Sequence, residues 1–230
     1  MSWMFDEHAH AGLEHLTAAD VDAYDAKAQV DPVPDVQLLQ QRGLSHRHVL
    51  IDFGAGTGAL ALQAALVCHQ VIAVDVSPLM LTALRRKAAE QGVTNIKCAE
   101  AGFLTYQHRA PPADFVYSRN ALHHLPEVWQ VQALRRMGEV LKPGGVLLLR
   151  DLVYGFTPAD TEAGIQTWLQ AAPLSAAQGF PKHELETHVR SEFSTYTWLL
   201  EVMLDRTGFN IEASEFSASG IFAAYVCRKR

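Results

Sequence analysis

Residues 49–58, with the sequence VLIDFGAGTG, constrain the fold of this chain more than any other segment. Val49, Leu50 and Ile51 form an apolar run that is typical of a strand buried on both faces. A glycine-rich turn follows at once, and a helical pattern covers residues 59–67. This order is typical of an open α/β sheet, which binds its ligands where the strands end. Glycine in such a turn lets the backbone approach a ligand closely, because it has no Cβ.

The glycine spacing separates two kinds of nucleotide site. Gly54, Gly56 and Gly58 give the pattern G-x-G-x-G, whereas the dinucleotide-binding fingerprint is G-x-G-x-x-G. A second apolar strand, residues 70–75, ends in Asp75. An acidic residue at that position can accept both hydroxyls of a ribose. The glycine loop and Asp75 together therefore predict a cofactor that contains a nucleoside.

The rest of the chain alternates strands and helices up to residue 151. The expected strands cover residues 49–53, 70–75, 95–99, 115–117 and 146–149. The expected helices between them cover residues 59–67, 78–91 and 127–141. Helices of this length between strands imply crossover connections and a parallel sheet covered on both faces.

The end of the chain breaks this alternation. A helix at 194–207 precedes two apolar segments, 209–216 and 221–227, which only four residues separate. Four residues cannot contain a crossover helix, so the pair must form an antiparallel hairpin. The predicted fold class is α/β, a Rossmann-like doubly wound and mostly parallel seven-stranded sheet with an antiparallel C-terminal hairpin and helical caps.

We expect one domain over residues 1–230, because no repeat or linker divides the chain. Its expected parts are an N-terminal helical cap (1–47), a cofactor-binding core (48–151), an acceptor-side insertion (152–193), and the last helix with the hairpin (194–230).

Charge and composition exclude several classes of function. The net charge is −6 and the basic residues are scattered, which argues against extended contact with nucleic acid. No apolar run approaches the ~18 residues of a membrane span, and no secretory signal is visible, so a cytoplasmic protein is expected. Three isolated cysteines in apolar surroundings do not indicate a disulfide or zinc framework.

The motif D-F-G-A-G-T-G followed by A-V-D-V-S resembles the cofactor half-site of the class I S-adenosylmethionine-dependent methyltransferases. Within that class the chain is similar to the small-molecule enzymes of the methyltransferase-11/12 type. Members carry a reversed last strand, as the expected hairpin does. The resemblance implies S-adenosylmethionine as the cofactor and direct in-line transfer of its methyl group to a small-molecule acceptor.

The resemblance also implies a set of cofactor contacts. Asp52 and the loop backbone would meet the methionine part, Asp75 the ribose, and Met80 the adenine. Glu100 and Ala101 correspond to a pair, one acidic and one small residue, that the family places near the adenine amino group. Asn120 corresponds to a residue that lines the amino-acid end of the cofactor. The full expected set is Tyr24, Asp52, Gly54, Ala55, Gly56, Thr57, Gly58, Asp75, Val76, Met80, Glu100, Ala101 and Asn120. For Tyr24 and Met80, packing alone is an equally open interpretation.

Two histidines lie where the family places its loop next to the transferable methyl. His124 or His123 could serve as a general base near neutral pH. Structural packing of one ring and solvent exposure of the other is the alternative. No metal site is expected from this pair, because adjacent side chains point apart and no third ligand is evident. His8, His10 and His15 are expected to be solvated.

The insertion is expected to build the acceptor pocket. Arg190, Tyr196 and Trp198 are the candidate acceptor contacts, and a cationic Arg190 would suit an anionic acceptor. The expected assembly is a monomer or a homodimer.

Three other functions remain open at this stage. The first is a non-catalytic S-adenosylmethionine-binding or regulatory protein, because no essential base can be named. The second is methyl transfer to RNA or protein. The third, a nicotinamide-dependent oxidoreductase, is opposed by the glycine spacing and the terminal hairpin.

Overall fold

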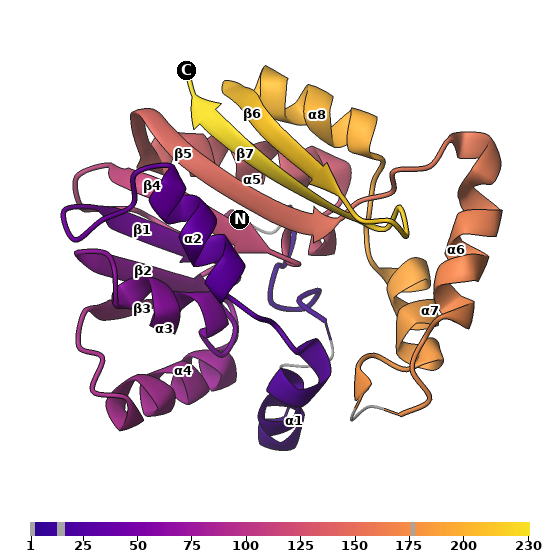
Figure 1. The fold of residues 1–230 in the computed structure, drawn as a ribbon, viewed down its shortest axis with the longest axis horizontal. Coiled ribbons are helices and arrows are strands. Elements are labelled where there is room, and N and C mark those ends of the chain that lie inside the picture. Colours follow the sequence, from indigo (N-terminus) through magenta and orange to yellow (C-terminus); the bar gives the residue numbers. More distant parts are fainter. Residues whose placement is uncertain (1–2, 13–16, 176–177) are drawn as a thin grey trace.

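The computed structural model describes residues 3–12, 17–175 and 178–230 (Figure 1), so His15 lies outside the described residues. One seven-stranded sheet, in the order β3-β2-β1-β4-β5-β7-β6, runs through the molecule. Among the described residues, no helix has both the length and the apolar character that a membrane span requires.

The first five strands form the parallel part of the sheet, as expected. They are β1 (Val49–Phe53), β2 (Gln70–Asp75), β3 (Ile96–Glu100), β4 (Ala113–Arg119) and β5 (Leu141–Leu152). The strand β5 begins directly after its helix and extends beyond the predicted 146–149 at both ends; its first part contains Gly144, with φ +73°, and the pairing with β4 shifts register there.

Helices cover both faces of this sheet. They are α2 (Val33–Gln41), α3 (Ala59–Ala65), α4 (Pro78–Glu90), α5 (Glu127–Val140) and α8 (Thr197–Arg206). Residues of α2, α3 and α4 pack in one apolar cluster against Leu50 and Leu148. Residues of α5 and α8 pack in a second cluster against Ile51 and Leu147. The alternation along β1 and β5 thus places successive side chains on opposite faces.

The chain ends in the expected antiparallel hairpin. The strand β6 (Phe209–Phe216) pairs with β7 (Phe222–Lys229), and β7 pairs antiparallel with β5. The predicted fold class is therefore confirmed, including the reversed end of the sheet.

Among the described residues, three α-helices lie outside the layered core. They are α1 (Ala18–Ala28), α6 (Thr161–Gln170) and α7 (Lys182–Ser191). Figure 1 shows α1 on one side of the strand ends and the α6–α7 pair on the other. The expected N-terminal cap of residues 1–47 divides at Pro32: α1 lies beside the strand ends, whereas α2 contributes Val36 and Leu39 to the core.

Candidate cofactor and acceptor site

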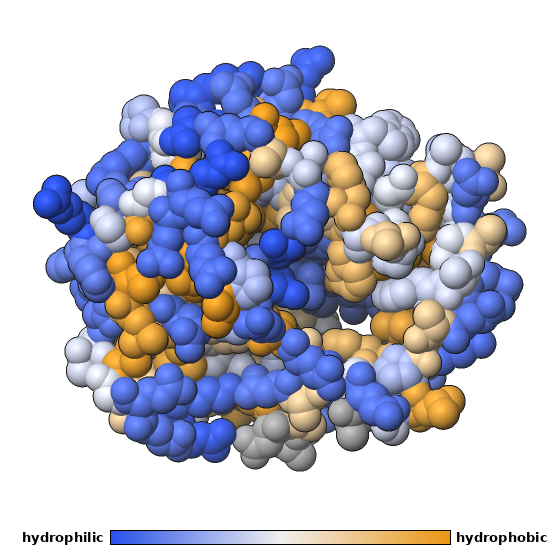
Figure 2. Space-filling model, viewed as in Figure 1, coloured by the Kyte–Doolittle hydropathy of each residue, from blue (hydrophilic) through white to orange (hydrophobic). Residues whose placement is uncertain are grey.

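A cavity of about 430 Å³ lies at the carboxyl ends of the parallel strands, between α1 and the α6–α7 pair. The space-filling view shows the surface hollowed between the body of the sheet and the α6–α7 segment (Figure 2). Eight of the expected cofactor residues line this cavity: Tyr24, Gly54, Gly56, Asp75, Val76, Met80, Ala101 and Asn120. Both expected catalytic histidines, His123 and His124, line it as well.

The glycine loop has the left-handed backbone that its sequence predicts. Gly54 has φ +69°, and a Cβ on it would lie 2.4 Å from the Cβ of Ala121. Gly56 has φ +53°, and the nearest atom to a Cβ there would be a Tyr24 ring carbon at 3.8 Å. Gly54 is therefore required for packing. Gly56 leaves its backbone open toward the cavity.

Asp75 joins this loop to the end of β2. Its Oδ2 accepts the Gly56 backbone N–H at 2.8 Å, and its Oδ1 accepts the Ser77 backbone N–H at 2.8 Å. These two bonds fix the carboxylate at the cavity wall. Charge-assisted bonds of this kind are stronger than neutral ones.

Asp52 lies behind the loop and does not line the cavity. Burial, and after it the negative charge of Asp75, raises the pKa of Asp52 well above its ordinary value. A cation bound near Asp52 would favour its ionised form, because an opposite charge offsets the effects of burial and of Asp75.

The α1 helix is attached to both sides of the cavity. Asp25 accepts a hydrogen bond from the Thr57 hydroxyl and pairs with Lys87 of α4. Lys27 pairs with Glu184 of α7 at 2.8 Å. Met80 packs against Tyr24 and Val21 and also lines the cavity, so it serves both as packing and as part of the cavity wall.

An ionic network around a buried carboxylate lies at the ends of β4 and β5. It was not predicted from the sequence. Asp35 of α2 accepts hydrogen bonds from the Tyr117 hydroxyl at 2.6 Å, from Arg119 at 3.2 Å and from Arg150 at 2.5 Å. Arg119 and Arg150 both line the cavity. In the sequence, the two arginines could be recognised only by their position at the ends of two predicted strands. The fold is needed to show that α2 supplies the carboxylate that binds them.

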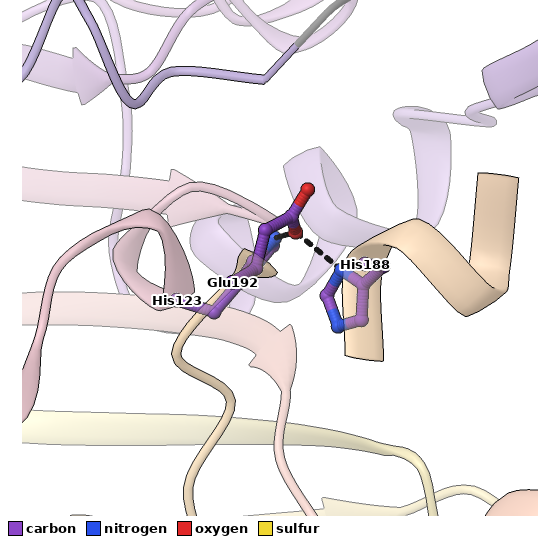
Figure 3. A group of neighbouring side chains, drawn as sticks. All are labelled: His123, His188 and Glu192. Carbon is purple, nitrogen blue, oxygen red and sulfur yellow. Dashed lines mark ion pairs between the residues drawn. The ribbon is translucent and has the colours of Figure 1, made fainter. Parts of the chain in front are cut away.

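The far end of the cavity holds a cluster of imidazoles and carboxylates (Figure 3). Nε2 of His123 lies 3.1 Å from Oε2 of Glu192, and Nδ1 of His188 contacts the same oxygen. Asp151 holds the other side of His123, through its ring Nδ1 and through its backbone N–H at 3.1 Å. Although burial lowers the pKa of His123, the charges of Asp151 and Glu192 raise it above its ordinary value.

His124 has the opposite character. Burial, and after it the positive charge of His123, lowers the pKa of His124 to about 3, so its ring is neutral at neutral pH. Its Nδ1 is buried, lies 3.9 Å from Oε2 of Glu192, and has no hydrogen-bond partner among the described residues. The unused Nδ1 of this neutral imidazole can accept a hydrogen bond from a ligand at the cavity wall, whereas the lowered pKa disfavours the protonated ring.

The remaining expected residues lie away from the cavity lining. They are Asp52, Ala55, Thr57, Gly58 and Glu100 of the cofactor set, and Arg190, Tyr196 and Trp198 of the acceptor set. Tyr196 bonds the Thr161 hydroxyl at 2.6 Å, while Arg190 and Trp198 are exposed. The insertion instead contributes Trp168, Phe180, Leu185, His188 and Glu192 to the wall.

Comparisons with known proteins relate this chain to methyltransferases. A family model described as a methyltransferase domain matches residues 50–145. An uncharacterized methyltransferase of Geobacillus kaustophilus is 28% identical over 170 residues, which cover 74% of this chain and 73% of that protein. The family model, this relative and the fold together support a class I S-adenosylmethionine-dependent methyltransferase.

Solved structures of other methyltransferases share the fold. An S-adenosylmethionine-dependent methyltransferase from Aquifex aeolicus has a TM-score of 0.65 at 16% identity, covering 94% of this chain and all of that one. The N-methyltransferase NodS from Bradyrhizobium japonicum, solved with S-adenosylhomocysteine, has a TM-score of 0.61 at 15% identity, covering 86% of this chain and 85% of that one.

The residues at the loop end of the cavity fit S-adenosylmethionine, the cofactor named for the similar Aquifex aeolicus structure. Gly56 leaves room for a ligand against the backbone, and Asp75 presents a fixed carboxylate beside it. A ligand with a sulfonium and an ammonium group also suits this end, because a positive charge there favours the ionised form of Asp52 behind the loop.

Proposed function

We propose that this methyltransferase transfers the methyl group of S-adenosylmethionine to a small-molecule acceptor inside the cavity, by direct in-line displacement. The supporting observation is that the cofactor-type residues line the same cavity as His123, His188 and Glu192. The bound cofactor supplies a methyl on a positively charged sulfur, which keeps the C–S electron pair and becomes neutral as the acceptor atom bonds to the carbon.

In this proposal the loop end binds the cofactor. Asp75 accepts the ribose hydroxyls, and the Gly54–Gly58 backbone lies along the methionine part. Met80 and Ala101 contact the adenine. Asn120 and Arg119, at the end of β4, face the amino-acid end, where a guanidinium suits a carboxylate.

The other end binds the acceptor. Trp168, Phe180 and Leu185 offer an apolar surface on which a small ring or chain can lie, and they exclude water from the reacting atoms. Positioning of two reactants can supply about 7–11 kcal/mol of the barrier reduction in favourable cases. Where the acceptor has a proton to lose, we assign its removal to His124 on its geometry, because its ring lines the cavity and its buried Nδ1 has no hydrogen-bond partner among the described residues.

The size and closure of the cavity favour a small acceptor over a polymer. Its volume of about 430 Å³ is near the lower end of the range for small-molecule sites. The Lys27–Glu184 pair joins the two caps beside it. An extended RNA or protein substrate needs an open groove, and for RNA also a basic surface, which the net charge of −6 does not favour.

The test has a binding arm and a turnover arm. Calorimetry with S-adenosylmethionine, S-adenosylhomocysteine and NAD should give micromolar binding of the first two and none of NAD. The chain is then incubated with labelled cofactor and separate pools of small acids, phenols, amines, RNA and protein. We expect S-adenosylhomocysteine to form with a small-molecule pool. Binding without turnover in any pool would favour the non-catalytic alternative, and turnover with RNA or protein alone would overturn the small-molecule assignment.

A further inference from the structure

Three side chains at the acceptor end present ligand atoms to one point. His123 follows β4, while His188 and Glu192 are one helical turn apart at the end of α7, and all three line the cavity. We call them the His–Glu cluster (Figure 3). One nitrogen of each ring and one carboxylate oxygen lie within 4.8 Å of one another. Among residues 3–12, 17–175 and 178–230, no other group of three such residues meets this condition.

In each of the two imidazoles, the ring nitrogen that faces away from the cluster contacts an oxygen atom. Nδ1 of His123 contacts Oδ1 of Asp151, and Nε2 of His188 lies 3.0 Å from Oγ of Ser194. Each ring is therefore oriented with its other nitrogen toward the cluster. Metal-ligating histidines show this arrangement, in which an oxygen partner fixes the tautomer and the orientation of the ring.

Backbone bonds hold the two ligand-bearing segments together. The Phe193 N–H donates to the carbonyl of His123 at 2.7 Å. The Gln130 side-chain amide donates to the carbonyls of Leu125 and Phe193, both at 2.8 Å. The loop after β4 and the end of α7 are thus fixed to each other by bonds that do not involve the ligand atoms. A site built this way is formed before its ligand arrives.

We propose that the His–Glu cluster binds one divalent ion of the first transition row, and that this ion holds the acceptor's nucleophilic oxygen beside the methyl group. Two imidazoles and one carboxylate are a common catalytic ligand set for zinc and its neighbours. The 3.1 Å between Nε2 of His123 and Oε2 of Glu192 is close to the about 3 Å separation of adjacent ligands around an ion with bonds near 2.1 Å. This inference rests on the proposed function and narrows its acceptors to those with an oxygen nucleophile.

Three protein ligands leave positions on the ion open toward the cavity. Structural zinc sites are closed by four protein ligands, whereas catalytic sites keep a position for water or substrate. In the proposed step the acceptor hydroxyl, held by the ion, releases its proton to water, because a bound divalent ion lowers the pKa of such a hydroxyl. The oxygen then bonds to the methyl carbon as the C–S bond breaks and sulfur keeps the electron pair. No oxidant or reductant is needed.

The sequence offered a reason against a metal site, namely that no third ligand accompanied His123 and His124. The fold supplies two further ligands from the insertion, because α7 ends beside the loop that follows β4. His124 itself remains outside the cluster, with its Nδ1 3.9 Å from Oε2 of Glu192.

The test begins with the full chain stripped by EDTA and dialysed. Zn²⁺ is titrated by calorimetry, and Co²⁺ by its visible absorption, which reports the number and geometry of the ligands. We expect one ion per chain, with affinity reduced about 100-fold or more in His188→Ala and in Glu192→Gln. His183→Ala, an exposed histidine on the same helix, is the matched control and should bind as the parent does. Unchanged S-adenosylhomocysteine affinity in each variant shows that it is folded.

The activity arm uses the same stripped chain with the acceptor pool that the turnover assay identifies. Methyl transfer should fall at least tenfold on stripping and return with Zn²⁺ or Co²⁺. The metal site would be overturned if the parent chain did not bind Zn²⁺ stoichiometrically, or if Glu192→Gln left Zn²⁺ binding unchanged. The three side chains would then form a hydrogen-bonded cluster only. Equal turnover with and without metal would overturn the role of the ion. If the proposed function is wrong, the chain will not bind the cofactor. The Co²⁺ spectrum does not depend on cofactor binding, so the two failures can be told apart.

Discussion

At the level of single residues, Asp75 offers the most direct test of the cofactor site. Its carboxylate is fixed by two backbone N–H groups and lines the cavity. A hydrogen bond to a charged group contributes about 1.5–3 kcal/mol, so losing those to the ribose in Asp75→Ala should weaken S-adenosylhomocysteine binding about 10- to 100-fold. Isothermal titration calorimetry measures this change.

The control for Asp75 is Glu90→Ala, which removes an exposed carboxylate at the end of α4. It should leave affinity unchanged. Asp75→Asn separates the charge from the backbone contacts, because an amide oxygen can still accept an N–H bond. Affinity within threefold of the parent in Asp75→Ala would remove the ribose assignment.

Asp52 should make cofactor binding dependent on pH. Its pKa is raised by burial and by Asp75, so the side chain becomes neutral at a higher pH than an ordinary aspartate. A cationic ligand favours the ionised form. Affinity for S-adenosylmethionine should therefore fall as pH falls through the raised pKa, and binding near that pH should release protons. Calorimetry in two buffers of different ionisation enthalpy measures the released protons.

The variant Asp52→Asn tests the sign of this effect in two ways. It should abolish the proton release and weaken binding of the sulfonium more than binding of neutral-sulfur S-adenosylhomocysteine. A raised pKa also means that the ionised group destabilises the ligand-free fold, a cost that grows as pH rises through that pKa. Asp52→Asn should therefore melt higher than the parent without ligand at neutral pH. The same pH profile in both proteins would contradict the assignment.

His124 should affect turnover and not cofactor binding. Loss of a positioned general base typically costs about 10²–10⁴ in rate, so His124→Ala should lower kcat by at least about 100-fold for an acceptor that loses a proton. Its affinity for S-adenosylhomocysteine should stay within threefold of the parent. His46→Ala, an exposed histidine remote in sequence, is the control. Equal kcat in His124→Ala and the parent would return the ring to a packing role.

Sequence reasoning identified residues whose position follows from local pattern. Gly54, Gly56 and Asp75 lie at strand ends, which apolar periodicity and turn residues locate directly. His188 and Glu192 have no such mark, because their role depends on how α7 packs against the loop after β4. Arg190 in the insertion and Trp198 in the last helix were chosen by residue type, yet both are exposed. The residue type alone does not tell which side chains of a helix face the cavity, so it could not separate His188 and Glu192 from Arg190 and Trp198.

At the level of elements, the caps are joined by few contacts beside the cavity. The Lys27–Glu184 pair links α1 to α7, and its side chains are 21% and 26% exposed. Partly exposed pairs contribute at most about 1 kcal/mol. We expect Lys27→Gln and Glu184→Gln each to speed S-adenosylhomocysteine dissociation by no more than about fivefold, as followed by stopped-flow tryptophan fluorescence.

The exchanged pair Lys27→Glu with Glu184→Lys should restore the parent dissociation rate, since the ion pair is re-formed in the opposite sense. High salt should reduce the difference between parent and single variants, because it screens the pair. Equal dissociation rates in all four proteins at low salt would mean that the caps do not retain the cofactor through this contact.

Elements were predictable where length and connection restricted them. A four-residue link between two apolar segments allowed only a hairpin, and β6 and β7 pair accordingly. The helix α2 was grouped with the N-terminal cap because it precedes the first strand. Its Val36 and Leu39 instead belong to the sheet core, and its Asp35 binds the arginines of β4 and β5. Contacts between elements so distant in sequence leave no local pattern.

At the level of the whole molecule, the cofactor site joins segments from many parts of the chain. Its lining comes from α1, the ends of β1, β2 and β4, and the start of α4. A ligand there binds only when these segments are in their folded arrangement, so it stabilises the fold by mass action. At a concentration 1,000 times the Kd, the stabilisation is about 4 kcal/mol.

This stabilisation gives a test that needs no variant and no acceptor. For a chain of this size, 1 kcal/mol raises Tm by about 2–4 °C, so saturating S-adenosylhomocysteine should raise Tm by about 8–16 °C. NAD at the same concentration should leave it unchanged, because the loop lacks the dinucleotide spacing. Differential scanning calorimetry measures both. A shift of under 2 °C with S-adenosylhomocysteine at that saturation would mean that the ligand also binds the unfolded chain or that the segments do not form one site. An equal shift with NAD would reopen the oxidoreductase alternative.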